Sequence, residues 1–387
     1  MPKKYIVALT VIILISIGIV TLIKTLNVRP SHAPASTDFL KLPSGFHAEL
    51  FADNLGDTRV STPGPSAGPR LMEFKNDSVF VSVPKEGKIF VLEDKNADGI
   101  LDDSGRKIFI DGLTNPHGLA FSGDFTYIAE EERVIRVKDT NNDNVAEKET
   151  IETLMTLPAG GHYTRTIKIF GDKLYVSTGS SCNVCLETES ARAALQQCDL
   201  NGKNCRIFAK GLRNTVGFVE FEGKIYGTDN GRDWLGDNLP PDELNILEDG
   251  GNYGWPNCYG KNIHDTDFDK NTYTRNPCME PFERESFIDL GAHVAPLGLA
   301  FYAGTRFPDE YHGRIFIALH GSWNSTSPVG YKIVTVDPQT RSVTDFATGF
   351  IENGVVSGRP VDIMNFRGGL LVTDDNQGRI YKIYYEK

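Results

Sequence analysis

The chain has 387 residues, of which 40% are hydrophobic and 24% charged, and its formal net charge at pH 7 is −11. A surface with this excess of carboxylates repels phosphate groups, which argues against a nucleic-acid-binding protein and against attachment to anionic lipid through basic residues. The length beyond the first 40 residues is enough for one large repeat-built domain or two ordinary ones.

An uncharged, almost wholly apolar run occupies residues 5–23, with Lys3 and Lys4 before it and Lys24 after it. Such a run can span a bilayer, and its length and flanks favour an uncleaved anchor over a cleaved signal peptide. We therefore expect a single N-terminal transmembrane helix within residues 1–24. The two leading lysines predict a cytoplasmic amino terminus, with the rest of the chain on the periplasmic or extracellular side of the cell membrane. If the segment is cleaved, we expect a secreted protein.

Residues 25–40 are rich in Pro and Ser and show no helical or strand period, which is typical of a linker. Beyond them, short runs of alternating apolar and polar residues are separated by polar turns, as in β-strands. No convincing amphipathic helix follows, apart from a turn or two expected at 187–197. The globular part, residues 41–387, is therefore predicted to be all-β. The clearest strand-like runs are 78–83, 88–94, 126–131, 133–139, 166–170, 173–179, 224–229, 314–319, 332–337, 369–375 and 379–385.

Two internal repeats indicate how these strands are arranged. Residues 88–99 (KIFVLEDKNADG) are echoed by 133–144 (RVIRVKDTNNDN), and 112–121 by 211–221, with 295–302 of the same type. The first spacing, about 45 residues, is the length of one four-stranded propeller blade. Five to seven blades fill the available length, and we predict a six-bladed β-propeller. Loops from every blade then surround one central channel, so distant loops can share one site.

One copy of the first repeat carries oxygen ligands at alternate positions. Asp94, Asn96 and Asp98 are followed by Gly99, a spacing that resembles a calcium-binding EF-hand loop. The glutamate at loop position twelve is missing, and the flanks look like strands. The sequence leaves a structural calcium-binding turn and a solvated Asx-rich turn as equal alternatives.

The six cysteines of a chain placed outside the cytoplasm suggest disulfides rather than a metal site. One pair brackets an Asn-Gly turn and suits a cross-strand bridge, a second would close a polar loop, and the third is a Cys-x-x-Cys pair for which we prefer a local disulfide to redox activity. The expected pairs are Cys198 with Cys205, Cys258 with Cys278, and Cys182 with Cys185.

Three histidines stand in loops at the edges of predicted strands. His162 follows a Gly-rich loop, where an imidazole can act as a base near neutral pH. The alternative is a loop histidine that is hydrogen-bonded for structure. His117 and His320 occupy similar positions, so all three are candidates for one site.

Arginines and tryptophans also stand in these loops. Arg213, Arg232 and Arg359 lie in turns, and if they converge they would bind a multiply charged anion; individually, each could be a surface or ion-paired residue. Trp234, Trp255 and Trp323 could form a stacking platform for a flat ring or a sugar, although for Trp255 we favour packing between blades. No phosphate-binding loop, nucleophile elbow or dinucleotide fingerprint is present, so nucleotide and acyl-transfer functions lack support.

With these residues in view, the chain resembles the glucose/sorbosone dehydrogenase family, the soluble pyrroloquinoline-quinone (PQQ) dependent sugar dehydrogenases, and looks closest to its sorbosone-like branch. The resemblance runs from about residue 42 to the end. Its most specific stretches are GGHYTRTI, STGSSCNVC, GLRNTVGF, TDNGRDWLGDNLPPDELN, GGNYGWPNCYG, APLGLAFYAG, HGSWNSTSPVGYK and GRPVD.

The resemblance implies a six-bladed propeller with PQQ over the central channel and calcium against it. His162 matches the family's catalytic base, which takes a proton from the sugar while hydride passes to the quinone. Arg213, beside it in the catalytic site, forms with Asn214 the Arg-Asn pair that contacts the cofactor, and Arg359 matches an arginine near the quinone carboxylates. His117 stands where the glucose enzymes have a glutamine.

The same resemblance implies further contacts. His320 lies near the family's cofactor-binding lysine, and Trp323 belongs to the same cofactor-binding stretch. Gly231 and Arg232 fall where two backbone carbonyls ligate the cofactor's calcium. This calcium site also includes Asp242 and Glu243, which are expected to brace the turn. Departures from the glucose enzymes fit the sorbosone-like branch, and they lie at Gly161, Arg232 and Val361.

The sequence thus predicts a membrane-anchored quinoprotein that oxidises an aldose or sorbosone-like sugar by hydride transfer to calcium-bound PQQ and passes electrons to a quinone or cytochrome-type acceptor. The chemistry agrees, because a hard cation polarises the acceptor carbonyl and the hydride chemistry belongs to the cofactor. Two alternatives stay open: a calcium-dependent lactonase-type hydrolase, and a non-enzymatic propeller that binds carbohydrate.

Overall fold

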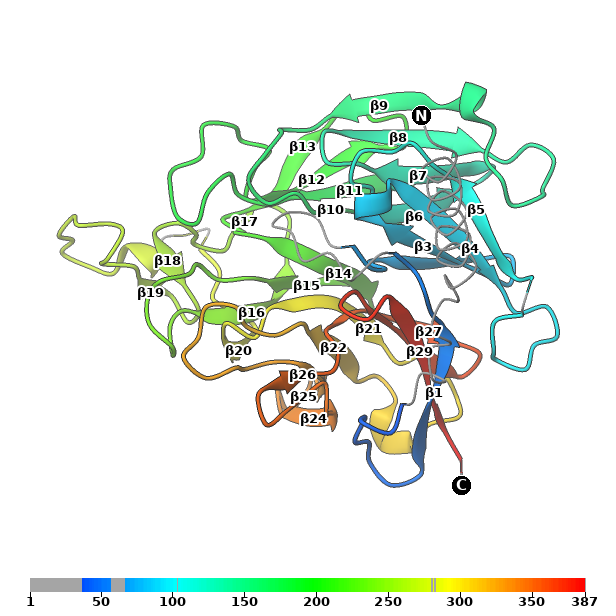
Figure 1. Ribbon diagram of the computed structural model, residues 1–387. Helices are drawn as coiled ribbons and strands as arrows, with labels where there is room; N and C mark the ends of the chain where they lie inside the picture. Colours follow the sequence, from blue (N-terminus) through cyan, green and yellow to red (C-terminus); the bar gives the residue numbers. More distant parts are fainter. Residues whose placement is uncertain (1–36, 57–66, 103, 280, 282, 387) are drawn as a thin grey trace, which may run out of the picture. The chain divides into compact units, whose positions relative to one another are not determined.

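Antiparallel β-strands form nearly all of the regular structure in the computed structural model (Figure 1). The structure describes residues 37–387 except 57–66, 103, 280, 282 and 387. The predicted transmembrane helix within residues 1–24 lies outside this part of the chain, as does most of the predicted linker. Among the described residues, no helix combines the length and the apolar character needed to cross a membrane.

The strands form six blades, each a sheet of four consecutive strands or their equivalent. Blade 1 contains β2 (Met72–Lys75), β3 (Ser78–Val83), β4 (Lys88–Glu93) and β5 (Arg106–Ile110). Blade 2 contains β6 (Gly118–Ser122), β7 (Phe125–Ala129), β8 (Arg133–Lys138) and β9 (Glu152–Thr156). Blade 3 contains β10 (Arg165–Phe170), β11 (Lys173–Thr178), β12 (Ala194–Asp199), β13 (Arg206–Lys210) and the short parallel strand β17 (Gly251–Asn252).

The second half of the propeller follows the same order. Blade 4 contains β14 (Thr215–Phe221), β15 (Lys224–Asp229), β16 (Pro241–Leu247) and β20 (Ile288–Ala292). Blade 5 contains β21 (Pro296–Phe301), β22 (Ile315–Leu319), β23 (Lys332–Val336) and β24 (Val343–Ala347). Blade 6 contains β27 (Pro360–Phe366), β28 (Gly369–Asp374), β29 (Arg379–Tyr385) and β1 (Phe46–Ala52).

The remaining elements are short. They are the ribbons β18 (Cys258–Tyr259) with β19 (Ile263–His264) and β25 (Ile351–Glu352) with β26 (Val355–Val356), and the 3-10 helices η1 (Pro84–Glu86), η2 (Lys148–Thr150), η3 (Pro277–Met279) and η4 (Asp309–Tyr311).

The ring closes by pairing the two ends of the propeller domain. β1, from the start of the domain, is the outermost strand of blade 6 and pairs antiparallel with β29, where Phe46 lies opposite Tyr385. The innermost strands β2, β6, β10, β14, β21 and β27 contact one another in sequence around the channel, and β27 contacts β2. The predicted all-β, six-bladed propeller is therefore confirmed.

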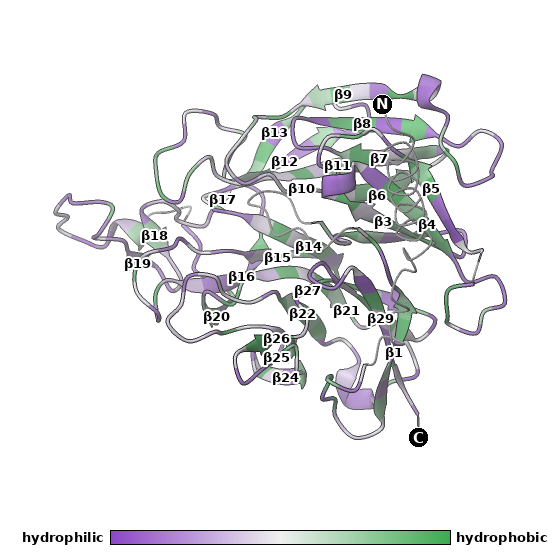
Figure 2. Cartoon of the chain, in the orientation of Figure 1, coloured by the Kyte–Doolittle hydropathy of each residue, from purple (hydrophilic) through white to green (hydrophobic). Residues whose placement is uncertain are grey.

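In blade 1 the second strand is more buried than the innermost one, and in most blades the outermost strand is the least buried. All six residues of β3 are buried because neighbouring blades cover both faces, whereas the outer strand β9 has no fully buried residue. Between blades 1 and 2, Phe80 and Ile89 pack in one cluster with Ile128 and Ile135. Burial of each of these side chains stabilises the fold by about 1.5–3 kcal/mol. In Figure 2 much of the hydrophobic colouring lies on the strands, and the outer loops are largely hydrophilic.

The cysteine predictions are confirmed, and one secondary-structure prediction is wrong. The disulfides are Cys182–Cys185, Cys198–Cys205 and Cys258–Cys278. The helical turn expected at 187–197 is absent, and the end of this segment is strand β12. Its hydrogen bonds are satisfied by pairing with both β11 and β13, so tertiary pairing overrides the helix propensity of the alanines.

Strand direction decides which loops can meet. In an antiparallel blade, the connections between blades and those between the second and third strands share one end of the propeller. The second repeat proves to be this inter-blade connection, because 112–121, 211–221 and 295–302 each lead into an innermost strand: β6, β14 and β21. The first repeat, at 94–99 and 139–144, connects third to fourth strands and therefore lies at the opposite end.

Candidate functional site

A cavity of about 850 Å³ opens at the end of the propeller where the inter-blade connections converge. Its volume is in the upper part of the range for small-molecule sites, about 300–1,000 Å³. Every blade except the second contributes polar or aromatic groups to its wall. These are Arg70, His162, Tyr163, Thr164, Arg213, Asn214, Asn230, Gly231, Asp233, Asp242, His293, His320, Trp323, Asn324 and Arg359.

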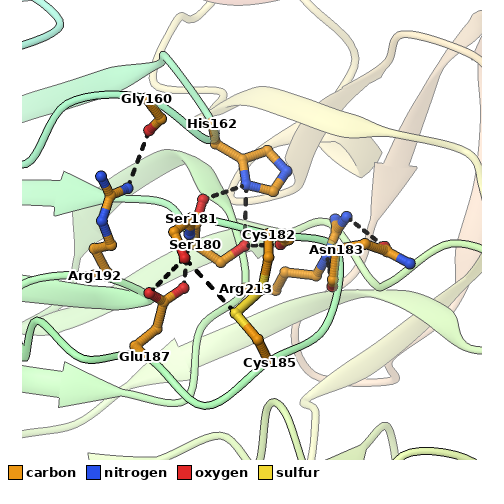
Figure 3. Close-up of a disulfide and its surroundings, with 10 residues drawn as sticks. All are labelled: Gly160, His162, Ser180, Ser181, Cys182, Asn183, Cys185, Glu187, Arg192 and Arg213. Carbon is orange, nitrogen blue, oxygen red and sulfur yellow. Dashed lines mark hydrogen bonds between the residues drawn. A yellow bond between two sulfur atoms is a disulfide. The ribbon is translucent and has the colours of Figure 1, made fainter.

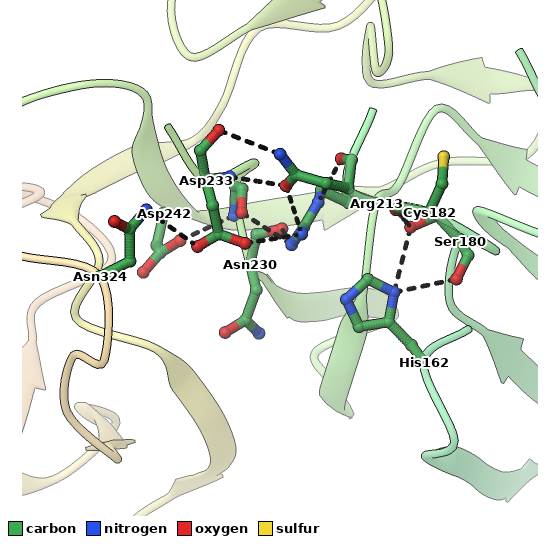
Figure 4. Close-up of polar contacts among 10 residues, drawn as sticks. His162, Ser180, Cys182, Arg213, Asn230, Asp233, Asp242 and Asn324 are labelled. Atoms are coloured by element: carbon green, nitrogen blue, oxygen red, sulfur yellow. Dashed lines mark hydrogen bonds and ion pairs between the residues drawn. The ribbon is translucent and has the colours of Figure 1, made fainter. Parts of the chain in front are cut away.

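His162 stands in the connection from β9 to β10, and hydrogen bonds fix its ring. Its Nδ1 lies 2.9 Å from the Ser180 carbonyl oxygen and 3.0 Å from the Ser180 hydroxyl, and that hydroxyl donates to the Cys182 carbonyl at 2.7 Å. Because a carbonyl only accepts, Nδ1 carries the hydrogen and Nε2 keeps its lone pair. Figure 4 shows the second ring nitrogen turned away from Ser180.

The surroundings also keep His162 uncharged. Burial lowers its pKa to about 4, and the positive charge of Arg213 acts in the same direction, followed by those of Arg165 and Arg192. A neutral imidazole with a free Nε2 lone pair is the form that accepts a proton. His162 is therefore chemically competent as a general base.

Two buried arginines hold the Gly-rich loop that precedes His162. Arg165 is fully buried and its guanidinium donates to the carbonyl oxygens of His162, Thr164 (2.9 Å) and Pro158 (2.6 Å). Arg192 donates to the carbonyl oxygen of Gly160 at 3.1 Å (Figure 3) and to that of Ala159. The loop thus has its backbone acceptors satisfied by cations that also depress the pKa of the base.

Arg213 is buried, and all five of its guanidinium N–H groups have protein acceptors. Nε donates to the Asn183 carbonyl (2.9 Å), Nη1 to the carbonyls of Gly231 (2.7 Å) and Asn230 (3.2 Å), and Nη2 to the Asn183 side-chain oxygen (2.9 Å) and Asp233 (3.2 Å). These acceptors come from the loops after β11 and after β15. The predicted cofactor contact of Arg213 stays a prediction; its hydrogen bonds here organise two walls of the cavity.

The Cys182–Cys185 disulfide closes the loop that reaches both key residues. Asn183, between the cysteines, accepts from Arg213, and its side-chain oxygen also accepts from the Asp233 N–H at 2.8 Å. Ser180 at the start of the same loop orients His162. Figure 3 shows the disulfide beside these contacts. One short cross-linked loop therefore positions both His162 and Arg213.

On the opposite wall, Arg359, His320 and Arg70 form a connected group. Arg359 donates to the carbonyls of Gly321 (2.5 Å) and His320 (3.2 Å). The His320 Nε2 lies 2.9 Å from Asp375, which also pairs with Arg70 at 2.8 Å. Burial lowers the pKa of His320 to about 4, against the opposing charge of Asp375, so its ring is neutral.

The turn that carries Gly231 is braced from behind by buried carboxyls. Asp242 accepts the N–H groups of Gly231 and Ala295, both at 2.7 Å. Burial raises the pKa of Asp242 to about 6. The predicted bracing role of Asp242 is thus visible in its contacts. Asp229 similarly accepts the N–H groups of Arg213 and Asn214, both at 2.9 Å, and burial raises its pKa to about 7.

Several predicted site residues lie away from the cavity wall. His117 is fully buried beneath it, near Thr166. The Arg232 side chain pairs instead with Asp265 and Asp267, each at 3.0 Å. Glu243 lies behind the Gly231 turn, beside a small cavity of about 20 Å³ that Arg232 also lines. In contrast, His162, Arg213, Asn214, Gly231, Asp242, His320, Trp323 and Arg359 all line the main cavity.

The three residues of the EF-hand-like turn lie at the far end of the propeller. The buried Asp94 accepts the Gly99 N–H at 2.9 Å and pairs with Arg367 at 3.1 Å, while Asp98 accepts from the Asn96 side chain at 2.9 Å. These contacts are those of an Asx-rich turn neutralised by a protein cation. Calcium binding there stays a prediction.

Sequence reasoning missed Arg70, Asn230, His293 and Asn324 on the wall, and Arg165 and Arg192 beneath it. For Arg165 a signal existed, because it follows His162 closely in the same loop-to-strand junction. Arg70 and His293 stand in inter-blade connections, the class of loop that the propeller prediction already placed at the channel.

Fold and site together define a six-bladed β-propeller whose central cavity is lined by a neutral histidine and three arginines. The chain belongs to the TrAA12-like family, whose sequence profile matches residues 41–386. An uncharacterized protein of Borreliella burgdorferi is 35% identical over 366 residues, covering 91% of this chain and 92% of that protein.

A PQQ-dependent pyranose dehydrogenase of Coprinopsis cinerea is 28% identical over 224 residues, which cover 46% of this chain and only 30% of the dehydrogenase. The calcium structure of the Trichoderma reesei protein of carbohydrate-active enzyme family AA12 superposes with a TM-score of 0.75 at 21% identity, over 93% of this chain and 100% of that one. The holo PQQ domain of the Coprinopsis pyranose dehydrogenase gives 0.72 at 21% identity, over 89% and 97%. These structural likenesses show a shared fold.

Proposed function

We propose that the chain is a PQQ-dependent oxidoreductase that oxidises a sugar, an aldose or a sorbosone-like sugar, in the cavity of the propeller. The observation that carries the proposal is His162, held neutral with its Nδ1–H on the Ser180 carbonyl and its Nε2 free, in a cavity lined by three arginines. The TrAA12-like family and the named activity of the Coprinopsis relative support it. Assignment to the sorbosone-like branch rests on Gly161, Arg232 and Val361.

The residues present fit a planar quinone that carries carboxylates. The buried Nε of Arg70 has no protein partner, and none is seen for Nη1 of Arg359 within the described part of the chain. Arginines with free N–H groups bind carboxylates strongly and with defined geometry. Arg70, Arg359 and Asn214 would hold PQQ, which when bound supplies the two-electron acceptor.

The chain's own residues supply the proton chemistry. Oxidation of a sugar hydroxyl to a carbonyl removes a hydride from carbon and a proton from oxygen. The Nε2 atom of His162 accepts that proton, and the charge of Arg213 stabilises the negative charge that develops on the oxygen. The same positive charge disfavours the imidazolium, so His162 returns the proton readily to solvent.

We propose calcium at the Gly231 turn. The oxygens available there are the Gly231 carbonyl, the Asp242 carboxylate and the Asn230 side-chain oxygen, the ligand type that calcium prefers. The Gly231 carbonyl also accepts from Arg213, which leaves its second lone pair for an ion. Chelation with EDTA should abolish dye reduction, and calcium should restore it.

The lactonase-type alternative requires side-chain carboxylates and Asn converging on a metal at the channel mouth. Among the described residues, the only group of three His, Cys, Asp or Glu ligand atoms close enough to share an ion is Cys182, Cys185 and Glu187. Its two cysteines are joined in a disulfide and are not thiolate ligands. The Asp242 and Asn230 oxygens proposed for calcium would serve either reaction, so a lactone assay without any electron acceptor decides between hydrolysis and oxidation.

We further propose that the propeller lies on the extracytoplasmic side of the cell membrane, anchored by residues 5–23, and delivers electrons to a quinone or cytochrome-type acceptor. Three disulfides support an oxidising compartment. Protease treatment of intact cells should digest the propeller domain of the anchored protein, and protection of that domain until lysis would contradict this placement.

The test of the proposed function is a titration of the purified full-length chain, loaded with calcium, with PQQ. Absorbance spectra before and after each member of a panel of aldoses should show binding of the quinone and then its reduction. A folded protein that changes no PQQ spectrum, or lactone hydrolysis without any electron acceptor, would contradict the proposal.

A further inference from the structure

Two tryptophans stand exposed at the rim of the cavity and contact each other. Trp234, in the loop after β15, and Trp323, in the loop after β22, have 67% and 69% of their surfaces exposed. Their ring centroids lie 5.4 Å apart with the planes at 85°, an edge-to-face pair that bridges blades 4 and 5. Trp323 lines the cavity and Trp234 does not, so the pair leads from the cavity outward.

The exposure of Trp234 is built into its loop. Its φ angle is +72°, a conformation that bulky residues rarely adopt. The loop is tied down on both sides of it. Before it, the Asp233 N–H donates to the Asn183 side-chain oxygen at 2.8 Å; after it, the His293 Nε2 donates to the Gly236 carbonyl at 2.7 Å, and Asp237 accepts the Thr326 N–H at 2.9 Å. Strained residues that persist under such constraint cluster at ligand sites. A buried indole ring would be stabilised by packing. An exposed ring that is held at the rim of the cavity therefore points to a ligand site.

We propose that Trp234 and Trp323 form a saccharide-stacking platform that binds the second and further units of a glycan whose terminal sugar occupies the cavity. The proposal rests on the proposed function and narrows its substrate class from free monosaccharides to oligosaccharides. An indole face carries negative charge density and attracts the C–H face of a pyranose, while rim groups meet its hydroxyls. Asp237, Asn238, Thr326 and Ser327, which follow the two tryptophans in their loops, are exposed.

A glycan fits this platform better than a protein does. A stable protein interface buries about 1,000 Å² or more, whereas the feature here is one aromatic pair among polar residues. The pair is also continuous with the cavity through Trp323. A linear glycan can fill the cavity and the platform together, and a folded electron acceptor cannot enter the cavity.

The test compares glucose with maltose-series and cellulose-series oligosaccharides on the full-length chain. Dissociation constants are measured by tryptophan fluorescence and calorimetry with calcium and PQQ that has been reduced beforehand, so that no sugar is oxidised, and KM is measured separately by dye reduction with oxidised PQQ. The variants are Trp234→Ala, Trp234→Phe and, as a matched control with 67% exposure elsewhere on the propeller, Val355→Ala. Thermal unfolding checks that each variant is folded.

In the wild type, one series should bind about tenfold more tightly than glucose. Trp234→Ala should remove that advantage and leave the glucose constants unchanged, Trp234→Phe should retain part of it, and Val355→Ala should retain all of it. Equal affinity for glucose and both series overturns the proposal, as does an advantage that survives in Trp234→Ala. A Trp234→Ala effect on the electron acceptor's KM alone also overturns it, in favour of acceptor docking.

The binding arm separates the two proposals. Glycan binding that depends on Trp234 without reduction of PQQ by any sugar contradicts the proposed oxidation and leaves the platform standing. Reduction of PQQ by glucose, with no tighter binding of longer glycans, contradicts the platform and leaves the proposed oxidation standing.

Discussion

The Nδ1 atom of His162 lies 2.9 Å from the carbonyl oxygen of Ser180. A catalytic histidine commonly has its tautomer set by a carboxylate, as in the Ser-His-Asp triad. Here a backbone carbonyl of a disulfide-closed loop sets it, and burial together with nearby arginines lowers the pKa of the ring and keeps it neutral. The account of the site depends on this arrangement, and the following predictions test its parts.

The pH dependence of turnover should report the pKa of His162. Burial and the charge of Arg213 lower this pKa to about 4, so the base stays unprotonated above that value. We expect kcat/KM to hold down to about pH 5 and to be half lost near pH 4. A midpoint near 6.5, the ordinary value for histidine, would show that the environment does not act on the ring.

Replacing Arg213 by Met should move the acidic loss of kcat/KM to higher pH, because the cation that disfavours the imidazolium form of His162 is gone. The five acceptors of Arg213 also lose their donors, so the free energy of unfolding should fall by about 3 kcal/mol. Arg213→Lys keeps the charge but not the five bonds, and it should lose stability without moving the acidic loss of kcat/KM far. If the acidic loss of kcat/KM stays at the same pH in Arg213→Met, the electrostatic role of Arg213 is contradicted.

Opening the Cys182–Cys185 disulfide should damage the site more than the fold. In a double Cys→Ser variant, the loop that carries Asn183 and Ser180 loses its cross-link, and kcat/KM should fall by about tenfold, as for loss of a residue that orients a catalytic group. The matched control is the double Cys→Ser variant at Cys198 and Cys205, a bridge in blade 3 away from the cavity wall. It should lower the melting temperature but leave kcat/KM unchanged.

Equal loss of kcat/KM in the two double variants would contradict a positioning role for the Cys182–Cys185 loop. Measuring kcat and KM separately in each variant distinguishes disordered positioning of the base from weakened sugar binding.

Glu243 should make the fold less stable as the pH rises. Burial and the neighbouring Asp229 raise its pKa to about 8, against about 4.3 in an unfolded chain. Between these values the folded state binds more protons than the unfolded state. The free energy of unfolding therefore falls with increasing pH, by about 1.4 kcal/mol per unit from this group, and the loss is complete above pH 8.

The matched variant is Glu243→Gln, which keeps an acceptor for the Gly260 N–H. After a flip of the Asn245 amide, the new NH₂ group can donate to Asn245 Oδ1, which is buried and has no partner now. In denaturant titrations, the free energy of unfolding should fall less from pH 6 to pH 8 in the variant than in the wild type. An identical loss would contradict the raised pKa.

Much of the fold could be predicted because period-two runs and the repeat of about 45 residues reflect local pairing. The placement of His162, Asn214, His320 and Arg359 around one cavity could be predicted as well, since propeller topology brings inter-blade and second-to-third strand connections to one end.

Other features depend on contacts that no local pattern encodes. The five acceptors of Arg213 come from the 183 region and the 230–233 region, and Arg232 turns toward Asp265 and Asp267 rather than the cavity. The helical turn expected at 187–197 is wrong because β12 finds partners on both sides. Pairing across blades and loops, and not propensity, decides these cases.

The most direct test of the central claim is a single-turnover measurement of the rate at which bound PQQ is reduced by sugar, in the wild type and in His162→Ala. The account predicts that the variant binds the quinone with its spectrum and affinity retained but reduces it at least about 10²-fold more slowly. Reduction within a few-fold of the wild-type rate would contradict the assignment of His162 as the base.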